Sequence, residues 1–114
     1  MSRLVEGDLI WLTDGGVQGR EQSGRRPVIV VSIDAFNDIG MAMVCPVTSH
    51  QGSAHATRNP LEVALPKGLP IEGMVLCDQI KTIYWKARGA TKIANAGRQT
   101  LLEVRARLRK LLGV

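Results

Sequence analysis

The sequence has few of the residues and motifs that mark several large classes of protein. Only 4% of its 114 residues are aromatic, and it contains two cysteines and two histidines. No C-x-x-C or H-x-x-x-H pair occurs, so the usual spacing of zinc ligands is missing. The glycine-rich fingerprints of the Rossmann fold and the P-loop are missing as well. We therefore expect neither a metal nor a nucleotide cofactor.

Long apolar runs are also missing. The longest run is too short to cross a bilayer, and the opening MSRLVEGDLIW lacks the apolar core of a secretory signal. Cys45 and Cys77 both lie within apolar runs, where free cysteine behaves as a small buried hydrophobe in a reducing compartment. We expect one domain over residues 1–114, cytoplasmic and not bound to a membrane.

Positive charge is present in excess. The net charge is +5 and the pI is near 9.8, which favours a polyanionic partner such as nucleic acid or an acidic protein segment. A basic helix face is usually only a solvated surface, so its charge alone does not identify a binding site. Nearly all of the excess lies in residues 98–114, which hold Glu103 and five basic residues: Arg98, Arg105, Arg107, Arg109 and Lys110.

Short apolar and β-branched runs between polar segments predict a mainly β protein. The segment 34–40 has turn-forming residues, so the strands before and after it are expected to pair as antiparallel neighbours. Two long polar loops are expected at 13–24 and 48–60. The predicted strands cover residues 9–12, 28–32, 41–47, 61–65, 74–81 and 86–93.

The last segment has the pattern of an amphipathic helix. Thr100 and Glu103 fit a capping box, and Gly113 suits the end of the helix. We expect this helix to lie against a small, strongly bent antiparallel sheet or partly open barrel. The apolar residues at helical spacing are Leu101, Val104, Leu108, Leu111 and Leu112.

The heptapeptide EQSGRRP, residues 21–27, places a carboxylate and two guanidiniums just before an apolar strand. Pro27 disfavours the helical region for the preceding residue, so Arg26 is held extended at the start of the strand. A guanidinium fixed in this way offers two donors to phosphate oxygens and keeps its charge near neutral pH. Taken alone, adjacent arginines beside a glycine are more often a solvated turn.

The segment MAMVCPVTSH, residues 41–50, contributes a second polar group. Pro46 cannot donate to a strand ladder, so the strand should end at an edge or a bulge there, with Thr48 emerging at the strand mouth. Antiparallel pairing with the preceding strand would bring Arg26 close to Thr48, and Glu21 could reach the same phosphate. The alternative is a polar turn in which Thr48 and Ser49 satisfy their own backbone.

Four motifs give the chain a resemblance to a known family. They are GDLIW at 7–11, EQSGRRP at 21–27, CPVTS at 45–49 and CDQIKTIYWKARGATKI at 77–93. In this order they are similar to the MazF/PemK toxins of bacterial toxin–antitoxin systems, over nearly the whole chain. The resemblance implies an SH3-like small barrel and a homodimer. It also implies metal-independent, sequence-specific cleavage of single-stranded RNA by an mRNA interferase, and an acidic MazE-like antitoxin as partner.

The resemblance also implies roles for individual residues. Arg26 and Thr48 fall on the family's catalytic arginine and threonine, and Glu21 falls on an acidic position implicated in activity. RNA supplies its own nucleophile, the 2′-hydroxyl, so the products would carry a 2′,3′-cyclic phosphate or 3′-phosphate and a 5′-hydroxyl. His50 is a second candidate base because imidazole titrates near neutrality. The residues expected to contact RNA are Arg25, Gln22, Ser49, His50, Asp78, Gln79 and Lys81.

The chain departs from the family's pattern after Trp11. Many relatives have an acidic-aromatic-acidic-proline stretch there, whereas residues 13–17 read TDGGV and offer no ring to stack on a base. Trp11 and Trp85 are expected in the core, which leaves Phe36 and Tyr84 as uncertain candidates for contact.

Two other functions are compatible with a small barrel. One is a CcdB-like toxin that acts on DNA gyrase without nuclease activity, although such proteins lack the combined Glu-Gln, Arg-Pro and Pro-x-Thr-Ser pattern. The other is a catalytically silent barrel that binds RNA or protein.

Overall fold

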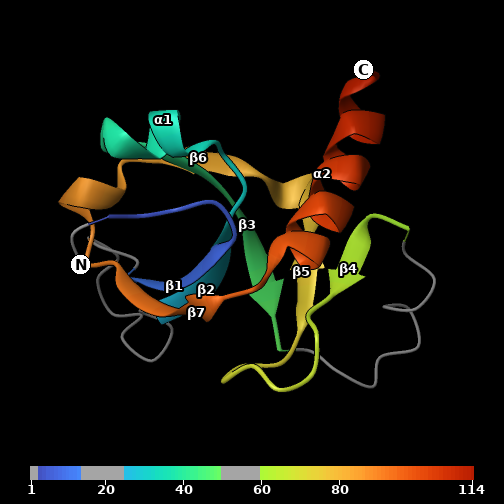
Figure 1. Ribbon diagram of the computed structural model, residues 1–114, viewed down its shortest axis with the longest axis horizontal. Coiled ribbons are helices and arrows are strands. Elements are labelled where there is room, and N and C mark those ends of the chain that lie inside the picture. Colours follow the sequence, from blue (N-terminus) through green and yellow to red (C-terminus); the bar gives the residue numbers. More distant parts are fainter. Residues whose placement is uncertain (1–2, 14–24, 50–59) are drawn as a thin grey trace, which may run out of the picture.

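The computed structural model describes residues 3–13, 25–49 and 60–114. It consists of an antiparallel sheet with the C-terminal helix against one side, which confirms the predicted mainly β fold (Figure 1). Residues 77–79 and 85–87 form short 3₁₀ turns, η3 and η4. The strands are β1 (Asp8–Thr13), β2 (Arg25–Val30), β3 (Ala42–Thr48), β4 (Glu62–Ala64), β5 (Met74–Leu76), β6 (Lys81–Ile83) and β7 (Thr91–Asn95), and the helices are α1 (Asp34–Asp38) and α2 (Arg98–Leu112).

The sheet is open. Its strand order is β4-β5-β3-β2-β1-β7, with β6 also paired to β3, and each pairing found among the described residues is antiparallel. Within the described part of the chain the end strands β4 and β7 do not pair with each other. The sheet is therefore bent and open, as one of the two predicted forms, and not a closed barrel.

Strand β3 changes partners along its length. Its residues 44–46 pair with β2, ending at Pro46 opposite Val28. Its other edge pairs first with β6 and then with β5, at Val47 and Thr48. Pro46 lacks an N–H for the ladder, and the pairing with β2 ends there. The prediction that the strand itself ends at Pro46 is wrong, because pairing with β5 on the other edge carries β3 on to Thr48. The two strands β2 and β3 therefore stop pairing just before the residues that the sequence singled out.

The predicted strand 74–81 is broken by η3. Between the pairs Val47–Val75 and Val44–Lys81, β3 advances by three residues and the opposite chain by six. The extra residues cannot continue the ladder, and η3 accommodates them as a turn. The break thereby moves Gln79 out of the sheet. The residue pattern of 74–81 does not reveal this break.

The faces of the sheet carry two apolar clusters. Val28 and Val30 of β2 belong to one, with Ile10, Leu12 and the indole of Trp85. Alternate residues of the same strand point the other way. The second cluster joins Ile29 to the α2 residues Leu101, Val104 and Leu108, as the helical spacing predicted. Burying each such side chain stabilises the fold by about 1.5–3 kcal/mol.

Helix α2 begins earlier than the sequence suggested. It starts at Arg98 after Gly97, and Thr100 is buried in its first turn, so the predicted capping box is wrong. The Oδ1 atom of Asn95 accepts a hydrogen bond from the Gly97 N–H at 2.8 Å, which stabilises the turn upstream. The predicted end is confirmed: Gly113 has a φ of 76° and its N–H bonds to the Arg109 carbonyl at 2.9 Å.

Two other segments differ from the prediction. Residues 34–38 form the short helix α1 instead of a plain turn, because Asn37 is buried and bonded from both sides. Its side-chain amide donates to the Ser32 carbonyl at 3.2 Å, and its own carbonyl accepts the Trp85 indole N–H at 2.9 Å. The strand expected at 86–93 begins only at Thr91, after η4. No helix in the described ranges is long and apolar enough to cross a membrane.

Candidate active site

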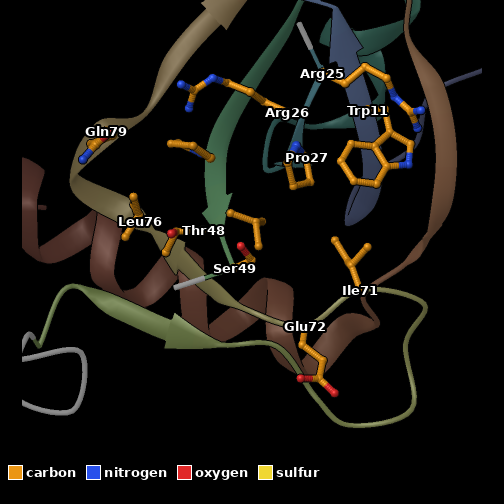
Figure 2. Close-up of a pocket in the computed structure, with 12 residues that line it drawn as sticks. Trp11, Arg25, Arg26, Pro27, Thr48, Ser49, Ile71, Glu72, Leu76 and Gln79 are labelled. Carbon is orange, nitrogen blue, oxygen red and sulfur yellow. The ribbon is translucent and has the colours of Figure 1, made fainter. Parts of the chain in front are cut away.

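A pocket of about 690 Å³ opens where β2 and β3 stop pairing (Figure 2). A pocket of this volume lies within the range of sites that hold small organic ligands. It brings together five of the residues that the sequence singled out, which come from three elements and the segment after β3: Arg25, Arg26, Thr48, Ser49 and Gln79. The other residues that line it are Trp11, Pro27, Pro46, Val47, Ile71, Glu72 and Leu76.

Arg26 and Thr48 reach this pocket from neighbouring strands. The last β2–β3 pair is Val28 with Pro46, and the same register continued by two residues leads to Arg26 and Thr48. The strands separate there, so the two side chains border a cavity instead of packing across a ladder. The proximity predicted from strand pairing is confirmed, and the catalytic roles stay predictions.

Arg25 and Arg26 point in different directions. Adjacent side chains alternate between the faces of a strand. Figure 2 shows Arg26 extending toward Gln79, whereas Arg25 extends over the indole of Trp11. The guanidinium carbon of Arg25 lies 4.5 Å from the centroid of that ring.

The prediction that Trp11 belongs to the core is wrong, whereas Trp85 is buried as expected. Trp11 is half-buried and lines the pocket, although its neighbours Ile10 and Leu12 are buried. The alternation of β1 places Trp11 on the opposite face from both neighbours, but residues 9–12 are apolar on both faces, so the sequence carries no signal that Trp11 lies at a pocket. Phe36 and Tyr84 do not line the pocket.

A second cavity of about 180 Å³ adjoins the first and shares Arg26, Pro46 and Gln79 with it. Lys81, expected to contact RNA, lines this cavity together with Arg88, which the sequence reasoning missed. Arg88 also donates from Nη2 to the Thr13 carbonyl at 2.7 Å, and so fastens the end of β1.

Some predicted site residues are not brought to the pockets. Asp78 lies in η3, is exposed and lines neither cavity. Glu21, Gln22 and His50 lie outside the described residues, so their roles stay predictions. A carboxylate that the sequence did not single out, Glu72, stands at the rim of the larger pocket.

The charge of the two cavities favours an anion. Arg25, Arg26, Lys81 and Arg88 line them, and Glu72 is the single carboxylate among the described lining residues. Opposite charges at close range attract most strongly where water is partly excluded. The arrangement suits a phosphodiester.

The two buried thiols, Cys45 and Cys77, are poor nucleophiles at neutral pH. Burial raises the pKa of the Cys45 thiol to about 12 and that of the Cys77 thiol to about 11. Both cysteines are free and buried. Covalent catalysis by a thiolate is therefore disfavoured.

Two of the basic residues of the C-terminal segment are structural. Arg105 donates to the Val31 carbonyl at 3.0 and 2.9 Å and to Glu6 at 3.1 Å. Arg107 donates from Nε to the Pro60 carbonyl at 3.0 Å. These bonds hold α2 on the sheet, so Arg105 and Arg107 contribute less to a landing site for polyanions than the sequence suggested.

Comparison with known proteins identifies the family. The PemK-like, MazF-like toxins of type II toxin–antitoxin systems match residues 6–112 of this chain. The chain belongs to the PemK/MazF toxin family. The resemblance seen in the four sequence motifs is thereby confirmed.

Individual PemK/MazF proteins are similar along nearly the whole chain. The endoribonuclease toxin MazF of Escherichia coli (strain K12) is 38% identical over 116 residues, covering 99% of each chain. Endoribonuclease PemK of Escherichia coli is 38% identical over 106 residues, covering 90% of this chain and 78% of PemK. The crystal structure of MazF (Form-I) from Deinococcus radiodurans superposes with a TM-score of 0.80 at 39% identity, covering 98% of both chains. A MazE-MazF structure (Form-II) from the same organism gives 0.81 at 37%, covering 98% of this chain and 97% of that one.

Proposed function

We propose that this protein is an mRNA interferase, the endoribonuclease toxin of a toxin–antitoxin pair. It cleaves single-stranded RNA at a specific short sequence and needs no metal or other cofactor. The observation that carries the proposal is the pocket in which Arg26 and Thr48 meet at the point where β2 and β3 separate. The names of the relatives, endoribonucleases MazF and PemK, support the same activity.

The reaction uses a nucleophile that the substrate carries. The 2′-hydroxyl loses its proton to a base and attacks the adjacent phosphorus, the bond to the 5′-oxygen breaks, and that oxygen takes up a proton. The products are a 2′,3′-cyclic phosphate and a 5′-hydroxyl. Arg26 neutralises the charge that develops on the phosphorane, and Thr48 donates a hydrogen bond to a non-bridging oxygen. DNA lacks the 2′-hydroxyl and is not cleaved.

A base must remove the proton of the 2′-hydroxyl. Glu21 is the first candidate for this base. If Glu21 instead orients an arginine, His50 is the alternative base. A glutamate with its ordinary pKa of about 4.3 is a weak base, so the role of base requires burial or a neighbouring group that raises the pKa.

The remaining polar residues bind the RNA strand on either side of the scissile phosphate. Lys81 and Arg88 line the adjoining cavity and suit a second phosphate. Arg25, Gln22, Ser49, Asp78 and Gln79 complete the proposed RNA-binding set.

The test is cleavage of a long unstructured RNA by purified protein in excess chelator. We expect cleavage at a short recurrent sequence, with 5′-hydroxyl ends and 2′,3′-cyclic phosphate or 3′-phosphate ends. Intact RNA at high enzyme concentration, or cleavage that requires a divalent ion, would overturn the proposal. Gyrase-dependent DNA breaks without loss of RNA would point instead to the CcdB-like function.

We further propose that the protein is a cytoplasmic homodimer neutralised by an acidic, MazE-like antitoxin. Solved structures of the Deinococcus radiodurans relative contain MazE with MazF. The basic lining of the two cavities here suits an acidic chain as well as RNA. Sedimentation of the protein alone and with the product of a neighbouring reading frame tests both assemblies.

A further inference from the structure

The larger pocket has two chemically different ends. Arg26, Thr48 and Gln79 make one end polar, whereas Trp11 and Ile71 give the other an apolar surface, which Arg25 and Glu72 border (Figure 2). A phosphate group needs only the polar end. The pocket is large enough to hold an organic group in addition, and the apolar end is suited to one that is flat and weakly polar.

Trp11 is held rigidly at the apolar end. Its strand lies between two others, so Trp11 pairs with Pro27 of β2 on one side and with Thr91 of β7 on the other. The residues before and after it, Ile10 and Leu12, are 0% and 2% exposed and anchor the backbone in the core. A side chain presented from such a strand loses little further freedom when a ligand binds.

Arg25 extends the surface that Trp11 offers. Its guanidinium carbon lies 4.5 Å from the ring centroid, a distance typical of a cation–π contact. The guanidinium is planar, and unpaired RNA bases stack on both aromatic rings and arginine planes. The two side chains together present stacking surfaces beside the phosphate end.

We propose that Trp11 and Arg25 form a stacking platform for one unpaired base of the RNA, next to the nucleotide whose phosphate meets Arg26 and Thr48. This inference rests on the proposed ribonuclease function. The platform supplies the ring that residues 13–17 do not contain, and it does so from a strand. Stacking of this kind fixes the RNA strand in the pocket and discriminates little between bases.

The test uses an RNA oligonucleotide whose cleavage site has been mapped, with a 2′-deoxy residue at that site to prevent cleavage. A set of partner oligonucleotides carries an abasic residue at each position in turn. We expect Trp11→Leu to weaken binding of the complete RNA by about 5- to 150-fold. At one position the abasic RNA should bind the wild type and Trp11→Leu equally.

Three matched variants separate stacking from other effects. Trp11→Phe keeps a ring and should retain much of the affinity. Arg25→Ala should lose affinity for the complete RNA and lose less for the RNA that is abasic at the stacked position. Arg26→Ala should weaken binding of both RNAs by the same factor, because it acts on phosphate.

Tryptophan fluorescence of the wild type reports on base stacking at Trp11 without any substitution. The chain has two tryptophans, and Trp85 is buried with its N–H bonded to the Asn37 carbonyl. RNA should quench the emission of Trp11, and Trp11→Phe should abolish the quenching.

The outcomes distinguish the platform from the ribonuclease itself. RNA that is bound and cleaved without quenching, and with no position-dependent difference between complete and abasic RNA, overturns the platform alone. Equal quenching by a polyglutamate peptide of matched charge also overturns it, because charge would then suffice. A wild type that neither binds nor cleaves RNA overturns the proposed function together with the platform.

Discussion

Arg26 and its neighbour Arg25 illustrate how much the direction of one side chain decides. Both are exposed guanidiniums at the start of β2, and only the family resemblance, not their residue type, predicts a catalytic role for Arg26 and RNA contact for Arg25. In the structure one extends toward Gln79 beside Thr48 and the other covers an indole. Replacement of Arg26 should therefore affect mainly the cleavage rate, and replacement of Arg25 mainly the binding of RNA.

Replacement of Arg26 by alanine should lower the cleavage rate at least a hundredfold. In the proposed mechanism the guanidinium neutralises charge that appears only in the transition state, and removal of one such donor typically costs about 10²–10³ in rate. The side chain is exposed, so the unfolding free energy should change by no more than about 0.5 kcal/mol. Single-turnover cleavage and urea denaturation measure the two effects.

Arg98→Ala, on the exposed start of α2, is the matched control and should cleave normally. If Arg26→Ala cleaves at a near-normal rate, the catalytic centre lies elsewhere and His50 is the next residue to test.

The buried thiols predict a loss of stability at alkaline pH. Burial raises the pKa of Cys45 from 9.0 to about 12, so the folded protein keeps the proton where the unfolded chain releases it. The stabilising difference is complete below pH 9 and is lost as the pH rises toward 12. The unfolding free energy of the wild type should fall over this window. Cys45→Ala should start from a lower unfolding free energy at neutral pH, and that free energy should fall less steeply with pH. Parallel curves for both proteins would contradict the assignment.

Strand β3 and the hairpin formed by β4 and β5 position Thr48. Gly73, before β5, has a φ of 152°, and a Cβ placed there would lie 2.2 Å from the Thr48 carbonyl oxygen. The main chain of the hairpin thus passes directly against the main chain of a proposed catalytic residue. A pocket of this kind depends on elements that lie more than twenty residues apart in the sequence.

Gly73→Ala should both destabilise the fold and slow cleavage. The added methyl must displace main chain, because the Thr48 carbonyl oxygen in its way is a backbone atom that no side-chain rotation can move. Gly68→Ala is the matched control, because Gly68 has a φ of 95° but no atom within 4 Å of the added Cβ. The control should lose about 1–2 kcal/mol of stability from backbone strain and keep its kcat. Equal kcat values in both variants would show that Gly73 does not position Thr48.

The distribution of charge over the whole molecule bears on antitoxin binding. The net charge is +5, and two groups of basic residues stand out, one lining the two cavities and the other on α2. Because Arg105 is used to hold α2 to Val31 and Glu6, the helix offers a weaker landing site than its composition suggests. The cavities should dominate the attraction of an acidic chain.

A double Arg25/Arg26→Ala variant should bind the antitoxin more weakly and with a smaller salt dependence than the wild type. Exposed charges control such association through screening, so the loss of two cations flattens the dependence on salt. An Arg98/Arg109→Ala variant removes the same charge from α2 and should behave like the wild type. Titration calorimetry over a salt series measures both. Unchanged affinity in both variants would show that charge does not govern neutralisation.

The sequence by itself determined the elements and the candidate residues. Alternating apolar runs predicted the main strands, the spacing of Leu101, Val104 and Leu108 predicted the terminal helix, and four motifs predicted the family. These signals are local, because periodicity reports which face of an element is buried and a motif reports residue types at fixed spacing. Strand pairing through the short connection at 34–40 also placed Arg26 near Thr48.

Only the tertiary structure decided how the site is assembled. The break at η3 exists because β5 and β6 must both pair with β3 in different registers, and it carries Gln79 to the pocket. The position of Trp11 depends on where the sheet stops being covered, which its own strand does not encode. Arg88 and Gly73 act on backbone atoms distant in sequence. Contacts between remote segments follow from the packing of the whole sheet, and no local pattern of residues specifies them.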